Sequence, residues 1–261
     1  MRIEFLTQND PLYVLPFFEE FVRSYAAEFP ILQISSSPTM GKRSRLQIVR
    51  ELTELYGVVG MGRLLLRVGR SGALGILPKK SGANRYHTLA QLCDAYNIPH
   101  RNIGNPNAPE FVESVRVRAP DLLISVACPY ILRDSLLTTP RFGSINVHHA
   151  PLPRYKGMMP TFWQMFHGEE SVGLTIHYMG LRVDEGDALF QGYQRIEPGE
   201  SLDHLIERSK RHAAHCIIQV LRGIRDGTNN RIALDHAAGS YFTFPTAAEI
   251  REFHRRGQRA I

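Results

Sequence analysis

Alternating and helical spacings of apolar residues divide the start of the chain into a strand, a helix and a second strand. Residues 2–7 form a short alternating apolar run that ends in polar turn residues. Residues 12–29 carry apolar side chains at helical spacing, and residues 31–37 again have the composition of a strand. A β-α-β opening of this kind predicts a parallel sheet with a right-handed crossover.

Similar patterns continue along the rest of the chain. The apolar run over residues 121–127 is typical of a central parallel strand, which is buried on both faces. The amphipathic segment 201–227 predicts a long helix that begins after Ser201 and ends at Gly227, since Ser and Gly are common caps. The other elements expected from these patterns are strands over 144–149 and 172–179 and helices over 87–96 and 108–121.

Strands that alternate with helices predict the α/β class: a Rossmann-like, open, mostly parallel sheet with helices on both faces. We expect residues 1–227 to form this domain, with a helical insertion at about 41–80. Residues 228–261 are expected to form a short C-terminal extension that is irregular and ends in a basic helix. From Tyr241 onward, the extension is expected to cover the sheet edge or to mediate pairing into a homodimer.

The insertion has a distinct composition. Residues 41–70 have helical character with a break around 57–62, and the second half carries leucines flanked by arginines. Two interpretations remain open. The segment is a helical insertion that packs on the sheet and leaves its arginines in solvent. Alternatively, it is an interfacial amphipathic helix that contacts a membrane or a partner.

Composition and charge narrow the class of protein. The chain of 261 residues is 43% hydrophobic and 21% charged, which suits a soluble globular protein. It has no apolar run near the ~20 residues that span a bilayer, and its start lacks the pattern of a secretory signal, so a cytoplasmic location is expected. The net charge of +6 is compatible with an anionic partner. A nucleic acid is not indicated, because aromatic residues do not interleave with the basic ones.

Metal and nucleotide sites are not indicated either. Cys93, Cys128 and Cys216 lie far apart without metal-ligand spacing, so we expect reduced thiols, no disulfide and no metal. The first turn, "TQNDPLY", contains no glycine. It is therefore neither a dinucleotide-binding loop nor a P-loop, and this disfavours NAD and ATP.

Three polar segments each follow a predicted strand: residues 129–132, 146–149 and 180–187. In an open parallel sheet, the carboxyl ends of the strands face one crevice, and ligands bind there. We therefore expect these three segments to lie close together.

Asn146, His148 and Asp184 are the candidate catalytic residues within these segments. Asn146 and His148 alternate on a strand, so their side chains point the same way. Their N–H groups are suited to stabilise an oxygen that gains charge, and a carboxylate nearby can accept a proton. Ser144 is out of phase as a nucleophile, which favours direct acyl transfer over a covalent intermediate. The alternative is structural: an amide and an imidazole that satisfy backbone groups, and an aspartate in a turn.

The segments "INVHHAPLPRYKG" (145–157) and "GLTIHYMGLRVDEGDALFQ" (173–191) resemble the folate-dependent formyltransferase family. The resemblance implies that Asn146 and His148 stabilise the tetrahedral oxyanion formed when an amine attacks the formyl carbon of 10-formyltetrahydrofolate. It also implies that Asp184 sets the state of His148 and helps to take the amine's proton, with water.

The same resemblance implies a pterin site. The segment "PDLLISVACPYILRDSLL" (120–137) is similar to the strand and loop that line the pterin pocket. His177 is a further candidate that faces the site, whereas His149 is expected to point to the opposite face. The residues implied to bind the pterin through backbone groups are Tyr130, Ile131, Leu132, Gly180 and Val183.

The implied function is N-formyl transfer to the amine of a small molecule, of which a nucleotide-linked amino sugar is one candidate. A methionyl-tRNA formyltransferase-like activity, a 10-formyltetrahydrofolate hydrolase and a non-catalytic basic binding module of the same fold remain alternatives. "TQNDPLY" lacks the glycine-rich phosphate loop of the member that acts on glycinamide ribonucleotide. Some 34 residues follow Gly227, too few for the C-terminal barrel of the tRNA enzyme. Phe162 and Trp163 are expected either to stack on an acceptor or to pack in the core.

Overall fold

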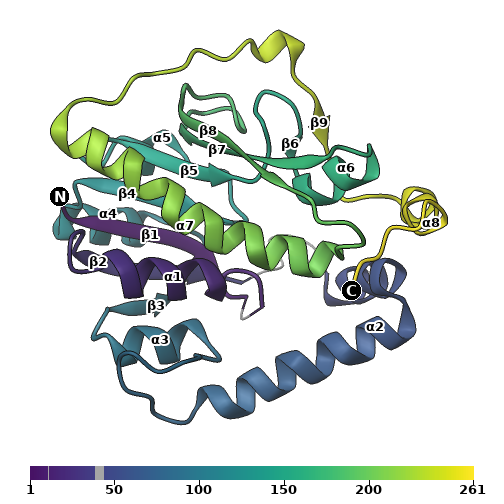
Figure 1. Ribbon diagram of the computed structural model, residues 1–261. Coiled ribbons are helices and arrows are strands. Elements are labelled where there is room, and N and C mark those ends of the chain that lie inside the picture. The colour runs from purple at the N-terminus through teal and green to yellow at the C-terminus, as the bar shows by residue number, and fades with distance from the viewer. Residues whose placement is uncertain (11, 39–43) are drawn as a thin grey trace.

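The computed structural model has one main sheet of seven strands (Figure 1). The structure describes residues 1–10, 12–38 and 44–261. The strands of this sheet are β1 (Ile3–Gln8), β2 (Ile31–Ser37), β3 (His100–Asn102), β4 (Leu122–Val126), β5 (Ser144–His148), β7 (Ser171–Tyr178) and β8 (Ala188–Arg195), in the spatial order β3-β2-β1-β4-β5-β7-β8. A separate two-stranded sheet joins β6 (Lys156–Gly157) to β9 (Tyr241–Phe242).

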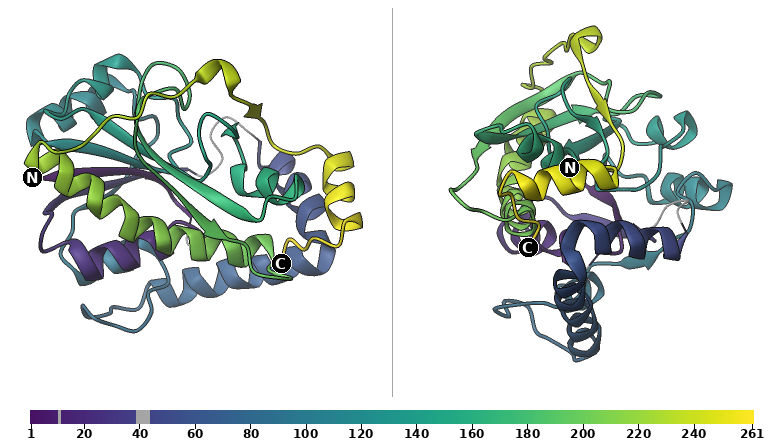
Figure 2. Two further views of the ribbon diagram at one scale, coloured as in Figure 1. Left: turned by 45° about the horizontal axis from the view of Figure 1, so that its top comes forward. Right: turned by 90° about the vertical axis from the view of Figure 1, so that its right-hand side faces the viewer.

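Helices lie on both faces of the main sheet and around its ends (Figures 1 and 2). They are α1 (Leu15–Tyr25), α2 (Arg45–Gly75), α3 (Leu89–Ala95), α4 (Pro109–Arg118), α5 (Asp134–Leu137), α6 (Pro160–Phe166), α7 (Leu202–Asp226) and α8 (Ala247–Arg255), with a 3-10 turn at His236–Ala238. Ser201 and Gly227 cap α7 at its two ends, as the sequence predicts. No helix within residues 1–10, 12–38 and 44–261 is long and apolar enough to cross a bilayer.

The first five strands of the sheet, from β3 to β5, run parallel, which confirms the predicted mostly parallel α/β fold. In contrast, β7 runs antiparallel to β5, with Asn146 opposite His177. The expectation that residues 180–187 follow the carboxyl end of a parallel strand is therefore wrong. The reason is the connection over residues 149–170, which starts and ends at the same end of the sheet, whereas a parallel neighbour needs a crossover to the other end. Edge strands β3 and β8 were not expected from the sequence.

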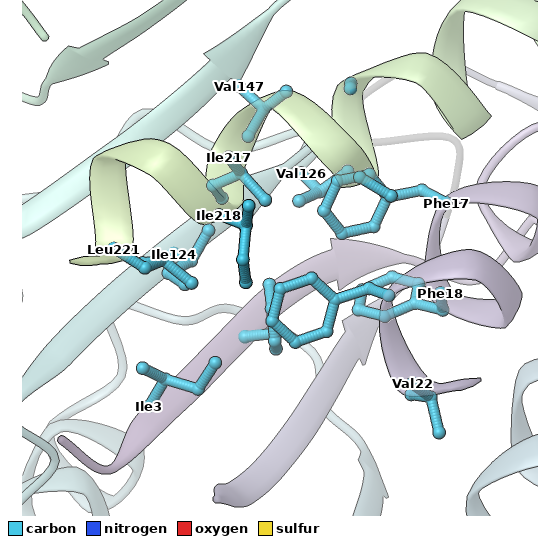
Figure 3. Close-up of a cluster of buried hydrophobic side chains, with 14 of the residues drawn as sticks. Ile3, Phe17, Phe18, Val22, Ile124, Val126, Val147, Ile217, Ile218 and Leu221 are labelled. Carbon is cyan, nitrogen blue, oxygen red and sulfur yellow. The ribbon is translucent and has the colours of Figure 1, made fainter. Parts of the chain in front are cut away.

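The larger core fills one face of the sheet, under α1 and α7 (Figure 3). Phe17 and Phe18 of α1 and Ile217 of α7 are fully buried against Ile124 of β4. Burying one such side chain contributes about 1.5–3 kcal/mol. The other face is covered by α4 and α5. Phe111 of α4 packs there in a second apolar cluster. The prediction of helices on both faces is confirmed.

The insertion is helical, and it packs on the body of the molecule through one side. Ser44 caps α2, and the predicted break falls at Gly57, whose φ of 68° is non-helical. Leu55 and Leu64 are buried in a cluster with residues of α6 and α8. Gln91 of α3 also donates hydrogen bonds to the carbonyl of Leu74 in α2 and to that of Leu77 just beyond it. Residues 41–43, at the predicted start of the insertion, lie outside the described residues.

The C-terminal segment lies against the rest of the protein at several places. Ile232 exchanges two backbone hydrogen bonds with Ala188 of β8, so the tail covers part of that sheet edge. The rings of Phe162 and Phe253 stack with centroids 4.8 Å apart. Trp163 is 4% exposed and donates from Nε1 to the carbonyl of Thr243. Phe162 and Trp163 therefore pack in the core. The domain boundary at residue 227 and the pairing of two chains stay predictions.

Candidate active site

The site is built around the carboxyl end of β5, which lies between β4 and β7 in the sheet. Asn146 and His148 project from the same side of this strand because side chains alternate. His177 of β7 lies opposite Asn146, and its Nε2 is 3.3 Å from Asn146 Nδ2. The central position of β5 holds these groups in a fixed register.

Asp184 reaches the same place because the loop after β7 folds back on itself. A Cβ on Gly186 would lie 1.7 Å from the carbonyl oxygen of Tyr178, so the close return of the chain requires glycine. Asp184 itself has a positive φ of 55°. Its carboxylate accepts a hydrogen bond of 3.0 Å from the N–H of Gly157. The hydrogen bond to Gly157 of β6 therefore holds this loop in place, although β7 itself runs antiparallel to β5.

The Asp184 carboxylate lies between two imidazoles. Its Oδ2 is 3.6 Å from Nδ1 of His148, and its Oδ1 is 3.7 Å from Nε2 of His177. All three side chains are less than a tenth exposed. The structure therefore brings Asn146, His148 and Asp184 together, and it adds His177 as the link between Asn146 and Asp184. Their catalytic roles stay predictions.

The proton on His148 is placed by the backbone. Nε2 lies 3.0 Å from the carbonyl oxygen of Tyr155 and donates to it, which leaves Nδ1 facing Asp184. Burial lowers the pKa of His148, while the Asp184 carboxylate opposes this shift. The imidazole is consequently neutral at pH 7, with a free lone pair on Nδ1.

Asp184 is held in its ionised form. Burial by itself raises the pKa of this carboxyl, but the positive charge that His148 and His177 carry when protonated, together with the Gly157 N–H, lowers the pKa well below its usual range. The Gly157 donor is uncharged, so it stabilises the carboxylate even while His148 is neutral. An ionised carboxylate beside a neutral imidazole is a pair that can accept a proton.

His177 orients the amide of Asn146. Its Nδ1 lies 2.8 Å from the carbonyl oxygen of Tyr178 and donates to it, so Nε2 accepts from Asn146 Nδ2. One of the two amide N–H groups is used in this way. The second makes no hydrogen bond to any residue that the structure describes, and it is available to a ligand oxygen.

Several contributors to the site were not apparent from the sequence. The Gly157 N–H and the Tyr155 carbonyl are backbone groups, so residue identity gives little signal for them. Lys156 and Glu185 form an ion pair of 2.9 Å that ties β6 to the loop of Asp184. Gly157, at the end of "PRYKG", is the one residue here whose type gives a signal in the sequence. Its φ of 94° favours glycine, so the glycine marks a special backbone conformation at this position.

That the side chain of His149 points to the opposite face of the strand stays a prediction. The charged groups that lower its pKa, after the effect of burial, include Lys210 and His212 of α7. Its buried Nε2 has no hydrogen-bond partner among the described residues. Burial lowers the pKa of Lys210 to about 8, while Asp10 opposes the shift. Lys210 also lowers the pKa of His148, and its own side chain is buried.

The predicted pterin-binding residues lie on two loops that border the site. Tyr130 and Met179 pack against the same apolar cluster, which the loops after β4 and β7 therefore share. Asn107 fixes the first loop by donating to the Ile131 carbonyl and accepting from the Arg133 N–H. Within the described parts of the chain, the backbone groups of Leu132, Gly180 and Val183 make no hydrogen bond. They are free to bind a ligand with a polar edge.

Two other kinds of site lie elsewhere or are missing from the described residues. A cavity of about 380 Å³ lies between α1, α2 and α7, and none of the site residues line it. Residues 1–10, 12–38 and 44–261 contain no group of three or more His, Cys, Asp or Glu that could hold a metal ion.

Comparison with known proteins gives a family match and relatives of known name. A family described as formyl transferase matches residues 78–221, a range that contains Asn146, His148 and Asp184. The methionyl-tRNA formyltransferase of Geotalea uraniireducens (strain Rf4) is 35% identical over 150 residues, 58% of this chain and 48% of that protein. The chain thus spans about half the length of the curated relatives it matches.

Solved structures share the fold at low identity. A sugar N-formyltransferase from Shewanella sp. aligns with a TM-score of 0.56 and 18% identity, over 93% of this chain and 76% of its own. An N-formyltransferase from Helicobacter canadensis, solved with folinic acid and dTDP-3-aminofucose, has a TM-score of 0.55 and 13% identity, over 92% and 70% of the two chains. At these identities the likeness shows the fold alone.

Proposed function

This chain belongs to the formyl transferase family, and on that premise we propose that it transfers the formyl group of 10-formyltetrahydrofolate to the amine of a small molecule. The observation that carries the proposal is the ionised Asp184 carboxylate, 3.6 Å from a neutral His148 and linked through His177 to Asn146. This arrangement supplies a proton acceptor and an oxyanion donor within one cluster of side chains.

Asp184 and His148 move the proton that the reaction releases. When the amine nitrogen forms its bond to the formyl carbon, it must lose a proton, and the carboxylate accepts it directly or through water. His148 Nδ1 faces the same carboxylate and shares that proton. The pair then returns the proton to the departing folate nitrogen as the bond from that nitrogen to the formyl carbon breaks. Protons balance, and the pair is restored.

Asn146 acts on the oxygen of the formyl group. Its free amide N–H donates to this oxygen as negative charge develops, and His177 holds the amide in place. A protonated His148 adds a positive charge nearby while the charge on oxygen is largest. Donors that are already oriented need no rearrangement during the reaction, which is the source of their catalytic effect.

A covalent intermediate on the protein is not proposed, because Ser144, the serine on β5, is engaged in a hydrogen bond and the three thiols are protonated. Ser144 donates from Oγ to the carbonyl of Leu137 and is buried. Burial raises the pKa of Cys93 to about 12, of Cys128 to about 11 and of Cys216 to about 11. These thiols are neutral at pH 7 and are poor nucleophiles.

The two bordering loops fit a folate. A pterin has an edge of alternating hydrogen-bond donors and acceptors, and the free backbone groups of Leu132, Gly180 and Val183 offer matching partners. The Helicobacter canadensis neighbour binds folinic acid, which supports the same assignment here. When bound, 10-formyltetrahydrofolate supplies a formyl carbon attached to a nitrogen leaving group.

The acceptor we propose is a nucleotide-linked amino sugar. The support comes from the sugar N-formyltransferase of Shewanella sp. and from the dTDP-3-aminofucose in the Helicobacter canadensis structure. Methionyl-tRNA is the second candidate, because the named relative from Geotalea uraniireducens has 35% identity to this chain. Transfer to water is the third outcome that the same site allows.

One experiment separates these acceptors. The protein is incubated with 10-formyltetrahydrofolate and, in parallel, with a panel of amino-sugar nucleotides, with methionyl-tRNA or with no amine, and products are identified by mass spectrometry. We expect a formylated sugar and tetrahydrofolate. Formyl-methionyl-tRNA would replace the proposed acceptor, and formate without any amine would make the protein a hydrolase. Asp184→Asn is expected to keep the fold and lose turnover. Near-full turnover by this variant would refute the role of Asp184.

A further inference from the structure

The second part of α2 exposes a row of large apolar side chains. Val58, Leu66 and Ile76 are 82%, 73% and 82% exposed. Val59 and Leu65 are also exposed, and Leu77 continues the row just beyond the helix. Scattered apolar residues are ordinary at a protein surface, but a contiguous apolar patch marks an interaction site.

These residues share one side of the helix. Positions 58, 62, 65, 69, 72 and 76 are separated by three or four residues in turn, which places them along a single stripe. We call this stripe, with Leu66 and Ala73 beside it, the outer face of α2. Its members are Val, Gly, Leu, Ala and Ile. The glycines at 62, 69 and 72 face open space, because an added Cβ would have no neighbour within 4 Å.

The opposite side of the helix is fixed to the body of the protein. Arg67 forms an ion pair of 2.6 Å with Asp203 of α7. Met61 and Leu64 are buried in the cluster shared with α6 and α8. Gly75 lies so close to Thr88 that a Cβ would overlap its side chain. The helix cannot rotate to hide the outer face without breaking these contacts. Figure 1 shows α2 along the bottom of the molecule, away from the sheet.

The charged residues of the segment that carries the outer face have one sign. Residues 55–93 contain no Asp or Glu. The cations of this segment are Arg63, Arg67, Arg70, Lys79, Lys80 and Arg85. Arg67 is neutralised by Asp203, whereas Arg63 and Arg70 are exposed and flank the apolar stripe. The face therefore combines apolar side chains with uncompensated positive charge.

We propose that the outer face of α2 binds the surface of a lipid bilayer that carries anionic headgroups. The apolar side chains would enter the boundary between headgroups and acyl chains, and the arginines and lysines would meet the negative headgroups. This docking holds the body of the protein at the surface and does not span the bilayer. The inference does not rest on the proposed function.

A lipid surface fits this face better than a second copy of the chain or a nucleic acid. Three of the six stripe positions are glycine, so the face offers few side chains to interlock with another helix. A second copy would also bring further cations with no acidic residue from 55–93 to pair with them. A nucleic acid would use the cations but would leave Val58, Leu65 and Leu66 in water. Fluid lipid fills an irregular apolar surface and supplies the opposite charge.

Vesicle sedimentation tests the proposal with the full chain. The protein is mixed with vesicles of phosphatidylcholine alone or of phosphatidylcholine with phosphatidylglycerol, and the bound fraction is measured after centrifugation. We expect binding to the anionic vesicles, a loss of most of it in high salt, and little binding to the neutral vesicles. No sedimentation with anionic vesicles would overturn the proposal.

Variants locate the contact. Leu65→Gln with Leu66→Gln replaces two exposed side chains, so the fold is expected to persist while vesicle affinity falls on the order of tenfold or more. Arg63→Gln with Arg70→Gln should also lower the affinity on the order of tenfold, as about 1 kcal/mol per cation implies. The matched control is Val117→Gln with Arg116→Gln on α4, where both side chains are also exposed. Equal losses in control and test variants would overturn the assignment to α2.

Two further measurements identify other occupants. Light scattering coupled to size exclusion detects a dimer that the Leu65→Gln, Leu66→Gln variant abolishes. A gel shift with RNA at low salt detects nucleic-acid binding through the arginines. Either result, in a protein that does not sediment with anionic vesicles, would assign the outer face to that partner and refute the lipid proposal.

Discussion

The cluster of Asn146, His148, His177 and Asp184 at the end of β5, which we call the β5 site, and the outer face of α2 both depart from the usual distribution of residues, in opposite directions. In the β5 site, charged and polar groups are buried, and Asp184, His148 and His177 all have partners. On α2, large apolar groups such as Val58, Leu66 and Ile76 are more than two thirds exposed. Buried charge is costly unless it is paired, and exposed apolar area reduces solubility.

The contrast indicates which parts of the molecule tolerate change. Each side chain of the β5 site contacts another one, so the loss of one contact is expected to disturb its neighbours. The outer face of α2 contributes little to folding, so changes there should affect docking only. Each prediction below tests one side of this difference.

The largest expected effect is the loss of turnover when a residue of the β5 site is replaced. Asn146→Ala or His148→Ala should lower kcat on the order of a hundredfold or more, as for loss of a donor to a developing oxyanion. The Leu65→Gln, Leu66→Gln variant on α2 should turn over at the rate of the unchanged protein. Rates are measured by tetrahydrofolate release at saturating substrates.

A control on the same strand keeps this result interpretable. Ser144→Ala removes a buried hydrogen bond to Leu137 and changes no residue of the β5 site, so it should lower stability and leave kcat unchanged. If Asn146→Ala retained its rate to within a few-fold, its role as an oxyanion donor would be wrong.

Local patterns predicted much of the fold. The β-α-β opening, the helix between Ser201 and Gly227 and the break at Gly57 depend on spacing and caps, which short stretches of sequence encode. The direction of β7 was not predictable in the same way, because a buried apolar strand has the same pattern in either direction. It depends on the connection over residues 149–170, which lies at one end of the sheet.

The candidate site was predictable at the level of side chains but not of backbone. Asn146, His148 and Asp184 carry a signal in their residue types. The Tyr155 carbonyl and the Gly157 N–H carry none, although they place the proton on His148 and stabilise Asp184. The outer face of α2 was obscured for another reason: apolar residues occupy both sides of this helix, so its amphipathic pattern is weak.

Alanine substitutions at two glycines, one beside the β5 site and one on the outer face of α2, should change the stability of the fold in opposite directions. Gly157 has a φ of 94°, and a Cβ there would lie 2.3 Å from the carbonyl oxygen of Phe242, so Gly157→Ala should destabilise the fold by about 1–3 kcal/mol or more. Gly69→Ala on the outer face meets no neighbour and should stabilise the helix by about 0.5–1 kcal/mol. Thermal unfolding should separate the two variants by several degrees. A Gly157→Ala protein as stable as the unchanged one would contradict the close contact between β6 and β9.

The pH dependence of kcat tests the protonation states of His148 and Asp184. Burial holds the pKa of His148 below its ordinary value of 6.5, so the imidazole is neutral at pH 7 and gains a proton only below pH 6.5. If the pair must accept a proton, kcat should fall about tenfold per pH unit below the pKa of His148. Stability is followed by circular dichroism at each pH, because a depressed histidine pKa also destabilises the fold as pH falls. An optimum at pH 5 would show that protonated His148 is the active form.

The smallest expected effect concerns Lys210, a buried cation whose charge lowers the pKa of His148. Its pKa of about 8 leaves it mostly protonated at pH 7, and it lowers the pKa of His148. Lys210→Met removes this charge, so the pKa of His148 should rise and the fall in kcat should move to higher pH by less than one unit. Arg211→Met on the exposed side of α7 is the matched control and should leave the profile unchanged. A shift to lower pH, or none, would mean that Asp184 and His177 alone set the charge of His148.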